Sequence, residues 1–125
     1  MKIIIAGSRK GFTQGIVDAV MKQAIKQWDI RAQDITVVSG CALGVDTYGI
    51  RWAEERGLPV MRYPADWDRH GKSAGTLRNI QMAAVADALV ALWDGESPGT
   101  RHMVQEADKR GLRVYIHRYP DTKSS

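Results

Sequence analysis

The sequence contains a single cysteine, Cys41, which excludes an internal disulfide bond and a cysteine-based metal cluster. It also lacks an apolar run long enough to span a membrane. No signal peptide precedes the first strand-like segment, "KIIIAG". We therefore expect the protein to lie in the reducing cytoplasm and not to associate with a membrane.

Familiar catalytic and metal-binding patterns are missing as well. The sequence has neither a phosphate-binding P-loop signature nor a nucleophile elbow. His102 and His117 have no partner at the spacing of metal ligands, so we expect no metal site and no required cofactor. Cys41 is interpreted as a small packed residue, because no histidine stands in an obvious relation to it.

The overall composition is that of a single globular domain. The chain has 125 residues, of which 44% are hydrophobic and 26% are charged, and no linker or repeat divides it. We expect one domain over residues 1–118, followed by a C-terminal tail at 119–125. The net charge of +4 favours anionic ligands, but the dispersed Lys and Arg residues do not single out nucleic acid.

Short apolar segments alternate along the chain with segments of helical periodicity. Strands are predicted at residues 2–6, 34–40, 59–64, 88–93 and 112–117, and helices at 13–28, 45–57, 75–88 and 100–111. Residues 64–75 are predicted to be a loop. Strands that are short and apolar throughout, alternating with helices, indicate a parallel sheet of about five strands with helices on both faces, which is a doubly wound three-layer α/β fold.

Ligands of such folds bind beyond the carboxyl ends of the strands, so the loops after the first four strands are the candidate site. Glycines there allow close backbone approach, Arg and Lys neutralise phosphate, helix N-termini offer free N–H groups, and a Trp can stack on a base. The predicted ligand-binding residues are Gly7, Ser8, Arg9, Ser39, Gly40, Gly44, Asp46, Trp67, Lys72, Gly75, Arg78, Asn79, Gly95, Ser97, Gly99 and Thr100.

Each of these loops also fits a simpler interpretation. Thr100 serves equally well as the N-cap of the last helix, and Asp46 is explained by its favourable place at a positive helix end. The four loops taken together at one edge of one sheet indicate a phosphate-bearing ligand. If the protein is an enzyme, Asp46, Asp94 and Glu106 are the candidates for its acid or base.

The motifs taken in order resemble the SLOG superfamily. They are "GSR" after the first strand, "SGCALGVD" after the second, "DW…HGKSAGTLRN", and "ADALVALWDGESPGT". Within that superfamily the chain is most similar to the small stand-alone YspA/YpsA-related proteins. The resemblance covers nearly the whole chain and implies a Rossmann-like fold in which the first strand lies beside the fourth. It also implies a nucleotide or a nucleotide-derived ligand such as ADP-ribose or an NAD-like molecule.

One group of distant relatives suggests roles for particular residues. In the cytokinin-activating phosphoribohydrolases, an Arg early in the helix before the fourth strand contacts the ligand and is followed four positions later by a Met, and Arg78 and Met82 fit that pattern. Those enzymes also place a catalytic Glu three residues after a Gly-Thr pair. Gly99 and Thr100 match the pair, but position 103 is a methionine, and Glu106 lies one turn further on.

Three functions remain open from the sequence. The chain is a nucleotide-binding sensor or sequestering module, a hydrolase that cleaves an N-glycosidic or phosphate bond of such a ligand, or a binder of single-stranded nucleic acid. The last follows from the basic charge and from the likeness of "SGCALGVD" to a loop of the DNA-processing protein DprA. A homodimer is implied only by analogy with relatives.

Overall fold

The computed structural model describes residues 1–118, and the expected tail at 119–125 lies outside the described residues. Five strands are present: β1 (Lys2–Gly7), β2 (Thr36–Ser39), β3 (Val60–Arg62), β4 (Ala88–Trp93) and β5 (Arg113–Arg118). The α-helices are α1 (Gln14–Trp28), α2 (Val45–Glu55), α3 (Trp67–His70), α4 (Ala74–Val85) and α5 (Pro98–Lys109). Two 3₁₀ turns are η1 (Ala32–Asp34) and η2 (Gly71–Ser73).

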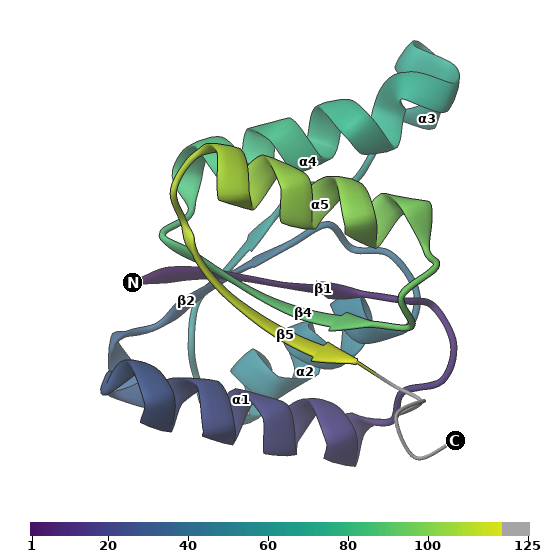
Figure 1. The fold of residues 1–125 in the computed structure, drawn as a ribbon. Coiled ribbons are helices and arrows are strands. Elements are labelled where there is room, and N and C mark those ends of the chain that lie inside the picture. Colours follow the sequence, from purple (N-terminus) through teal and green to yellow (C-terminus); the bar gives the residue numbers. More distant parts are fainter. Residues whose placement is uncertain (119–125) are drawn as a thin grey trace.

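All five strands run parallel in one sheet of order β3-β2-β1-β4-β5. Helices α1 and α2 cover one face of the sheet, and α4 and α5 cover the other (Figure 1). The expected Rossmann-like three-layer sandwich is therefore confirmed, including the pairing of β1 with β4. The strand order reverses between these two strands, which is where such folds open a crevice for a ligand.

The sheet separates two apolar cores. Ile3 and Ile5 of β1 are fully buried toward α1 and α2, while Ile4 is fully buried in the cluster on the opposite face. Alternate residues of a strand point to opposite faces, so a strand enclosed by two helical layers has no polar side. Trp52 of α2 is 2% exposed in the first core, as its helical spacing predicts.

The predicted helix starts and ends are largely correct. Thr13 caps α1, and its hydroxyl accepts from Ile16 N–H at 3.2 Å. Two predictions were wrong. Residues 64–75, expected as a loop, contain α3 and η2, which project from the sheet edge at the start of α4 (Figure 1). The last helix begins at Pro98 rather than at Thr100, with Ser97 as its N-cap.

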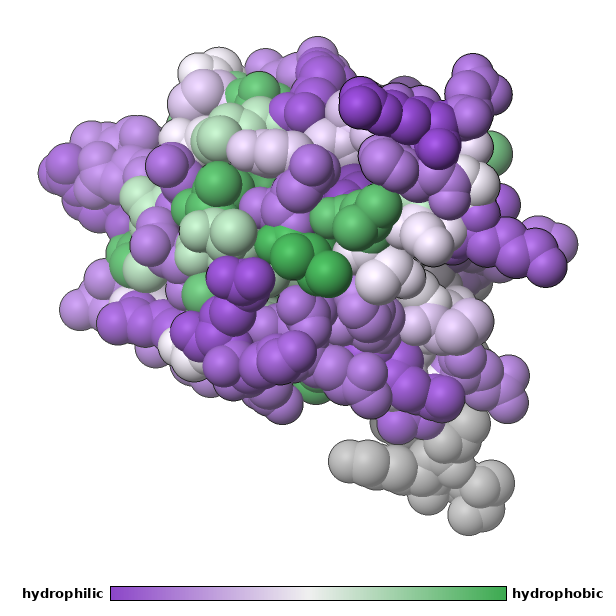
Figure 2. Space-filling model, turned by 90° about the horizontal axis from the view of Figure 1, so that it is seen from above, coloured by the Kyte–Doolittle hydropathy of each residue, from purple (hydrophilic) through white to green (hydrophobic). Residues whose placement is uncertain are grey.

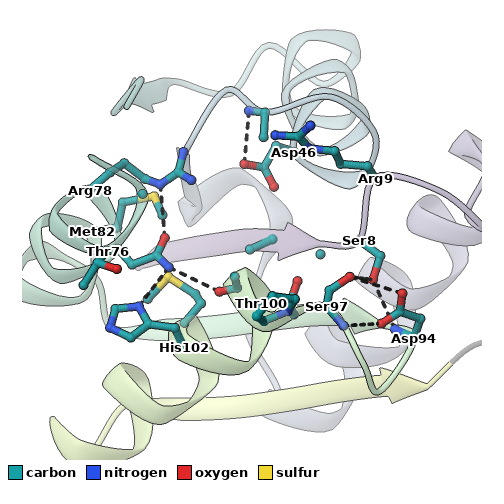
Figure 3. A pocket seen from close by; sticks show the side chains of 18 of the residues that line it. Ser8, Arg9, Asp46, Thr76, Arg78, Met82, Asp94, Ser97, Thr100 and His102 are labelled. Carbon is teal, nitrogen blue, oxygen red and sulfur yellow. Dashed lines mark hydrogen bonds between the residues drawn. The ribbon is translucent and has the colours of Figure 1, made fainter. Parts of the chain in front are cut away.

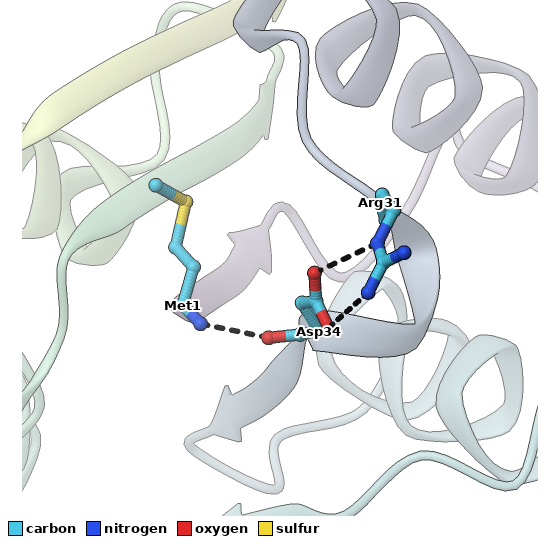
Figure 4. A network of polar contacts seen from close by, with 3 residues as sticks. All are labelled: Met1, Arg31 and Asp34. Carbon is cyan, nitrogen blue, oxygen red and sulfur yellow. Dashed lines mark hydrogen bonds and ion pairs between the residues drawn. The ribbon is translucent and has the colours of Figure 1, made fainter.

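The opposite edge of the sheet is closed by polar contacts on the surface. The amino group of Met1 donates to the Asp34 carbonyl oxygen at 2.7 Å, and Arg31 Nε lies 3.1 Å from the Asp34 carboxylate (Figure 4). These contacts connect the start of β1 with the turn that leads into β2. Because the groups are exposed, they contribute little to the free energy of unfolding.

The outer surface of α4 and α5 is mixed in character. Apolar groups gather in the middle of this face and are surrounded by hydrophilic ones (Figure 2). Leu77 of α4 is 39% exposed. The homodimer expected from the relatives stays a prediction.

Within residues 1–118, no helix combines the length and the apolar character needed to cross a bilayer.

Helix α2 packs closely on β1 at Gly49, which gives a test of the core. A Cβ at this position would lie 2.8 Å from Ile5 Cβ, inside the normal contact distance. We expect Gly49→Ala to lower the free energy of unfolding by about 1–3 kcal/mol despite the higher helix propensity of alanine. Denaturant titration measures this difference.

Gly15 of α1 provides the matched control. A Cβ there would meet a single atom, at 3.9 Å. We expect Gly15→Ala to leave the stability unchanged or to raise it by roughly 0.5–1 kcal/mol. Equal effects of the two substitutions would contradict the close packing of α2 on β1.

Candidate functional site

A cavity of about 680 Å³ lies at the carboxyl edge of the sheet, where the loops after β1 to β4 converge. Ligands of open α/β sheets bind at this edge. The residues that line the cavity are Ala6, Gly7, Ser8, Arg9, Lys10, Ala42, Asp46, Trp67, Lys72, Gly75, Thr76, Arg78, Asn79, Met82, Asp94, Ser97, Pro98, Gly99, Thr100, His102 and Met103. The structure thus brings together most of the residues predicted from the sequence.

The loops after β1 and β4 are joined by hydrogen bonds across the strand-order reversal. Ser8 N–H donates to the Leu92 carbonyl oxygen at 3.0 Å, and the Ser8 hydroxyl accepts from Asp94 N–H at 3.1 Å. The Asp94 carboxylate accepts from the N–H groups of Ser97 and Glu96 at 2.7 and 2.8 Å, and these bonds lower its pKa. Asp94 therefore holds its loop in shape and is a poor candidate for a general acid.

The start of α5 presents unsatisfied N–H groups to the cavity. The Ser97 hydroxyl donates to the Asp94 carboxylate at 3.1 Å and makes no capping bond to the helix. Pro98 has no N–H group, so Gly99 and Thr100 carry the first donors of the helix. A Cβ at Gly99 would meet nothing within 4 Å. This helix start can therefore receive an anion at close range.

A chain of polar side chains crosses the cavity from the β2 loop to α5 (Figure 3). Arg78 donates to the Gly40 carbonyl oxygen at 2.6 Å and, through Nε, to Asn79 Oδ1 at 3.1 Å. The Asn79 amide donates to the Gly99 carbonyl oxygen at 3.3 Å and lies 3.1 Å from His102 Nδ1. These contacts hold the Arg78 guanidinium in a defined position beside the cavity.

Sequence reasoning missed His102, which had been interpreted as isolated. His102 lies three residues and Met103 four residues after Gly99, so all three share the face of α5 that lines the cavity. That spacing was the available signal. Lys10 and Thr76 also line the cavity, and neither was predicted as a ligand-binding residue, although Thr76 lies in the motif "HGKSAGTLRN".

Asp46 is a buried carboxyl group at the cavity wall. Its side chain is at the start of α2, the residue is 4% exposed, and its Oδ2 accepts from Ala42 N–H at 3.3 Å. Burial raises its pKa from 3.8 to about 6, against the opposing influence of the Ala42 N–H and of the Arg78 and Arg9 charges. Figure 3 shows Arg78 and Arg9 reaching toward this carboxylate from opposite sides.

The rim of the cavity is formed by α3 and η2. The Asp66 side chain caps α3 by accepting from Arg69 N–H at 3.2 Å, and this places Trp67 at the first position of the helix. Trp67 is 54% exposed, although it lines the cavity. Lys72 of η2 also lines it. An exposed indole beside cationic groups suits a planar ring attached to phosphate.

Four predicted ligand-binding residues, Ser39, Gly40, Gly44 and Gly95, do not line this cavity. The Ser39 hydroxyl accepts from Cys41 N–H at 3.1 Å and is fully buried. Gly44 has a φ of +83°, and a Cβ there would lie 2.6 Å from the Arg9 carbonyl oxygen. Gly95 packs against the Arg118 guanidinium. These residues shape the loops behind the site.

Gly40 borders a smaller adjoining cavity of about 290 Å³. Arg9, Trp67 and Arg78 line both cavities, so they stand between the two. A side chain at Gly40 would collide with the Arg78 guanidinium, which explains the glycine here.

Glu106 lies away from both cavities. It is 8% exposed and pairs with Lys109 at 3.6 Å. Met103 occupies the position of the catalytic Glu of the phosphoribohydrolases, and it is an apolar group that lines the cavity. Within residues 1–118, no group of three or more His, Cys, Asp and Glu side chains is arranged to hold a metal ion.

A family model described as the YspA, cpYpsA-related SLOG family matches residues 1–70. The chain belongs to this family. A curated relative is the "Gene 61 protein" of Mycobacterium phage D29, which is 38% identical over 126 residues. The alignment covers 90% of this chain and 93% of that protein, so this SLOG-family chain and its phage relative correspond over nearly their full lengths.

The raised pKa of Asp46 predicts how the stability depends on pH. The folded protein binds a proton on Asp46 below about pH 6, whereas the unfolded chain does so only near 3.8. The penalty of burying the charge is therefore present at pH 7 and is lifted as the pH falls through 6 toward 4. We expect the stability of the wild type relative to Asp46→Asn to rise by about 2 kcal/mol over this window.

Urea titrations of both proteins at several pH values between 4 and 7.5 measure this difference. A difference that stays constant with pH would show that the carboxyl group titrates alike in the folded and unfolded chain.

Proposed function

We propose that this chain binds a nucleotide or a nucleotide-derived ligand, such as a nucleoside phosphate or an ADP-ribose- or NAD-like molecule. It would act as a sensor or a sequestering module. The observation that carries the proposal is one cavity that combines several cationic side chains, of which Arg78 is held by hydrogen bonds, with the open start of α5 and an exposed indole. Membership of a SLOG family supports a nucleotide-related ligand in general terms.

The phosphate would lie between the start of α5 and the basic side chains. Gly99 and Thr100 offer backbone N–H groups, and a helix N-terminus favours negative charge. Arg78 and Arg9 offer planar guanidinium groups for charge-assisted hydrogen bonds. Lys72 adds a third positive charge at the rim.

The base would lie at the rim against Trp67. The indole is the exposed aromatic side chain of this edge, and stacking of a base on an aromatic ring is worth about 1–3 kcal/mol. The apolar side chains of Met82 and Met103 line the cavity beneath, and both are 1% exposed. The volume of about 680 Å³ lies within the range of small-molecule sites.

Binding is favoured over hydrolysis by the carboxyl groups of the site. Asp94 is fully engaged with its own loop, Glu106 lies outside the cavity, and Met103 stands where the phosphoribohydrolases have a Glu. Asp46 is the remaining carboxyl group of the cavity wall. Chromatography of nucleotides after long incubation with the protein tests this: release of base or phosphate would make the chain an enzyme.

A thermal-shift screen with AMP, ATP, NAD, ADP-ribose, cyclic nucleotides and ribose 5-phosphate is the first experiment. A ligand that binds only the folded state raises the melting temperature. We expect a rise with at least one adenine-containing compound. No rise with any of them would contradict the proposal.

Arg78→Ala tests the phosphate site. Losing a charge-assisted contact costs about 1.5–3 kcal/mol, so we expect the dissociation constant of the ligand found in the screen to rise more than tenfold. Calorimetry measures it, and circular dichroism checks that the variant is folded. Arg51→Ala, on the exposed side of α2, is the charge-matched control and should bind as the wild type does. An unchanged dissociation constant for Arg78→Ala removes this residue from the site.

Trp67→Leu tests the place of the base. We expect weaker binding of the base-containing nucleotide by about fivefold to a hundredfold, because stacking is lost. Binding of ribose 5-phosphate, which has no base, should stay within twofold. Equal losses for the two ligands would show that Trp67 supports the fold of the rim rather than the base.

A further inference from the structure

Asp46 makes an unusual contribution to a cavity that attracts anions. Among the cations of residues 1–118, none forms an ion pair with this carboxylate, although Arg9 and Arg78 approach it from opposite sides (Figure 3). Its hydrogen bond from Ala42 N–H is long, at 3.3 Å, and the backbone N–H of Gly7 is a second donor that acts on it. The carboxylate therefore retains capacity to accept further hydrogen bonds while it is nearly buried.

A carboxylate here repels the phosphate that the rest of the cavity favours. Burial of a charge without a close partner is unfavourable, and a neutral residue would be better for binding phosphate alone. Asp46 is compatible with a bound ligand when the ligand presents a hydrogen-bond donor to it. A nucleotide carries two kinds of donor, the ribose hydroxyl groups and the amino or imino groups of the base.

The depth of Asp46 selects between these donors. Trp67, which would stack on the base, is 54% exposed at the rim, whereas Asp46 is 4% exposed. Arg9 and Arg78 flank Asp46, so the phosphate would lie near the same part of the cavity. In a nucleotide the ribose is directly attached to the phosphate, and the base is further away. The group of the ligand nearest to Asp46 is therefore the sugar.

From this arrangement we infer that Asp46 accepts hydrogen bonds from the 2′- and 3′-hydroxyl groups of the ribose and makes the site selective for ribonucleotides over analogues that lack both hydroxyl groups. This inference rests on the proposed function, because it assigns one part of the same ligand. Arg9 and Arg78 favour the charged form of the carboxylate against the effect of burial, and the two hydroxyl groups supply further donors to it. A site whose buried acceptor is left unpaired discriminates strongly against the analogue without the donor.

The experiment measures dissociation constants for AMP, GMP, CMP and UMP and for their 2′,3′-dideoxy analogues, with the wild type, Asp46→Asn, Asp46→Ala and Glu106→Gln. The matched control, Glu106→Gln, changes a carboxyl group that is almost as buried but lies outside the cavity. For each ligand pair that binds, the ratio of the two constants isolates the contribution of the hydroxyl groups from effects on folding.

We expect the wild type and Glu106→Gln to bind the ribonucleotide about tenfold or more tightly than its dideoxy analogue. In the two Asp46 variants this ratio should fall below about threefold, chiefly through weaker binding of the ribonucleotide. If the wild type binds the ribonucleotide and its dideoxy analogue equally tightly, the inference is overturned and the proposed function still stands. A ratio that persists in both Asp46 variants assigns the selectivity to another residue. If none of the four mononucleotides binds, the inference is overturned, and the proposed function then stands or falls with the thermal-shift screen.

Discussion

The central position of β1 in an all-parallel sheet is the constraint on which the site depends. Because β1 pairs with β2 on one side and β4 on the other, the loops from these strands leave at the same edge and at neighbouring positions. The Ser8 N–H extends the β1–β4 pairing past the strand by bonding to the Leu92 carbonyl oxygen. The residues that line the cavity lie in separate parts of the sequence, and this pairing brings the loops after β1 and β4 together in it.

The layers and most cavity-lining residues could be predicted, because their causes are local. Short apolar strands such as "ALVALW" have no polar side and indicate a buried sheet, and glycines after them mark close backbone approach. The family resemblance added the β1–β4 pairing. Thr13 caps its helix as predicted, because the cap requires only its own hydroxyl group and the N–H group three residues later.

What the sequence did not reveal depends on contacts between distant segments. Thr100 has the chemistry of a cap, but Pro98 suits the first turn of a helix, so α5 begins earlier and Thr100 is buried within it. The sequence could not show that His102 contacts Asn79, because this contact depends on how α4 packs beside α5. Gly44 and Gly95 are residues of the type found in ligand-binding loops. In the structure, however, Gly44 packs against the Arg9 backbone and Gly95 against the Arg118 side chain.

The bond from Arg78 to the Gly40 carbonyl oxygen has a consequence for the thermodynamics of recognition. An arginine on an open surface loses much rotamer freedom when it meets an anion, and that loss opposes association. Arg78 is already held by Gly40 and Asn79 in the unliganded protein. Its loss of side-chain entropy is therefore part of the free energy of folding and not of binding. In the proposed complex the contact of Arg78 with an anion would therefore be preorganised, and the rigidity of the β2 loop would contribute to the affinity although this loop lies away from the ligand.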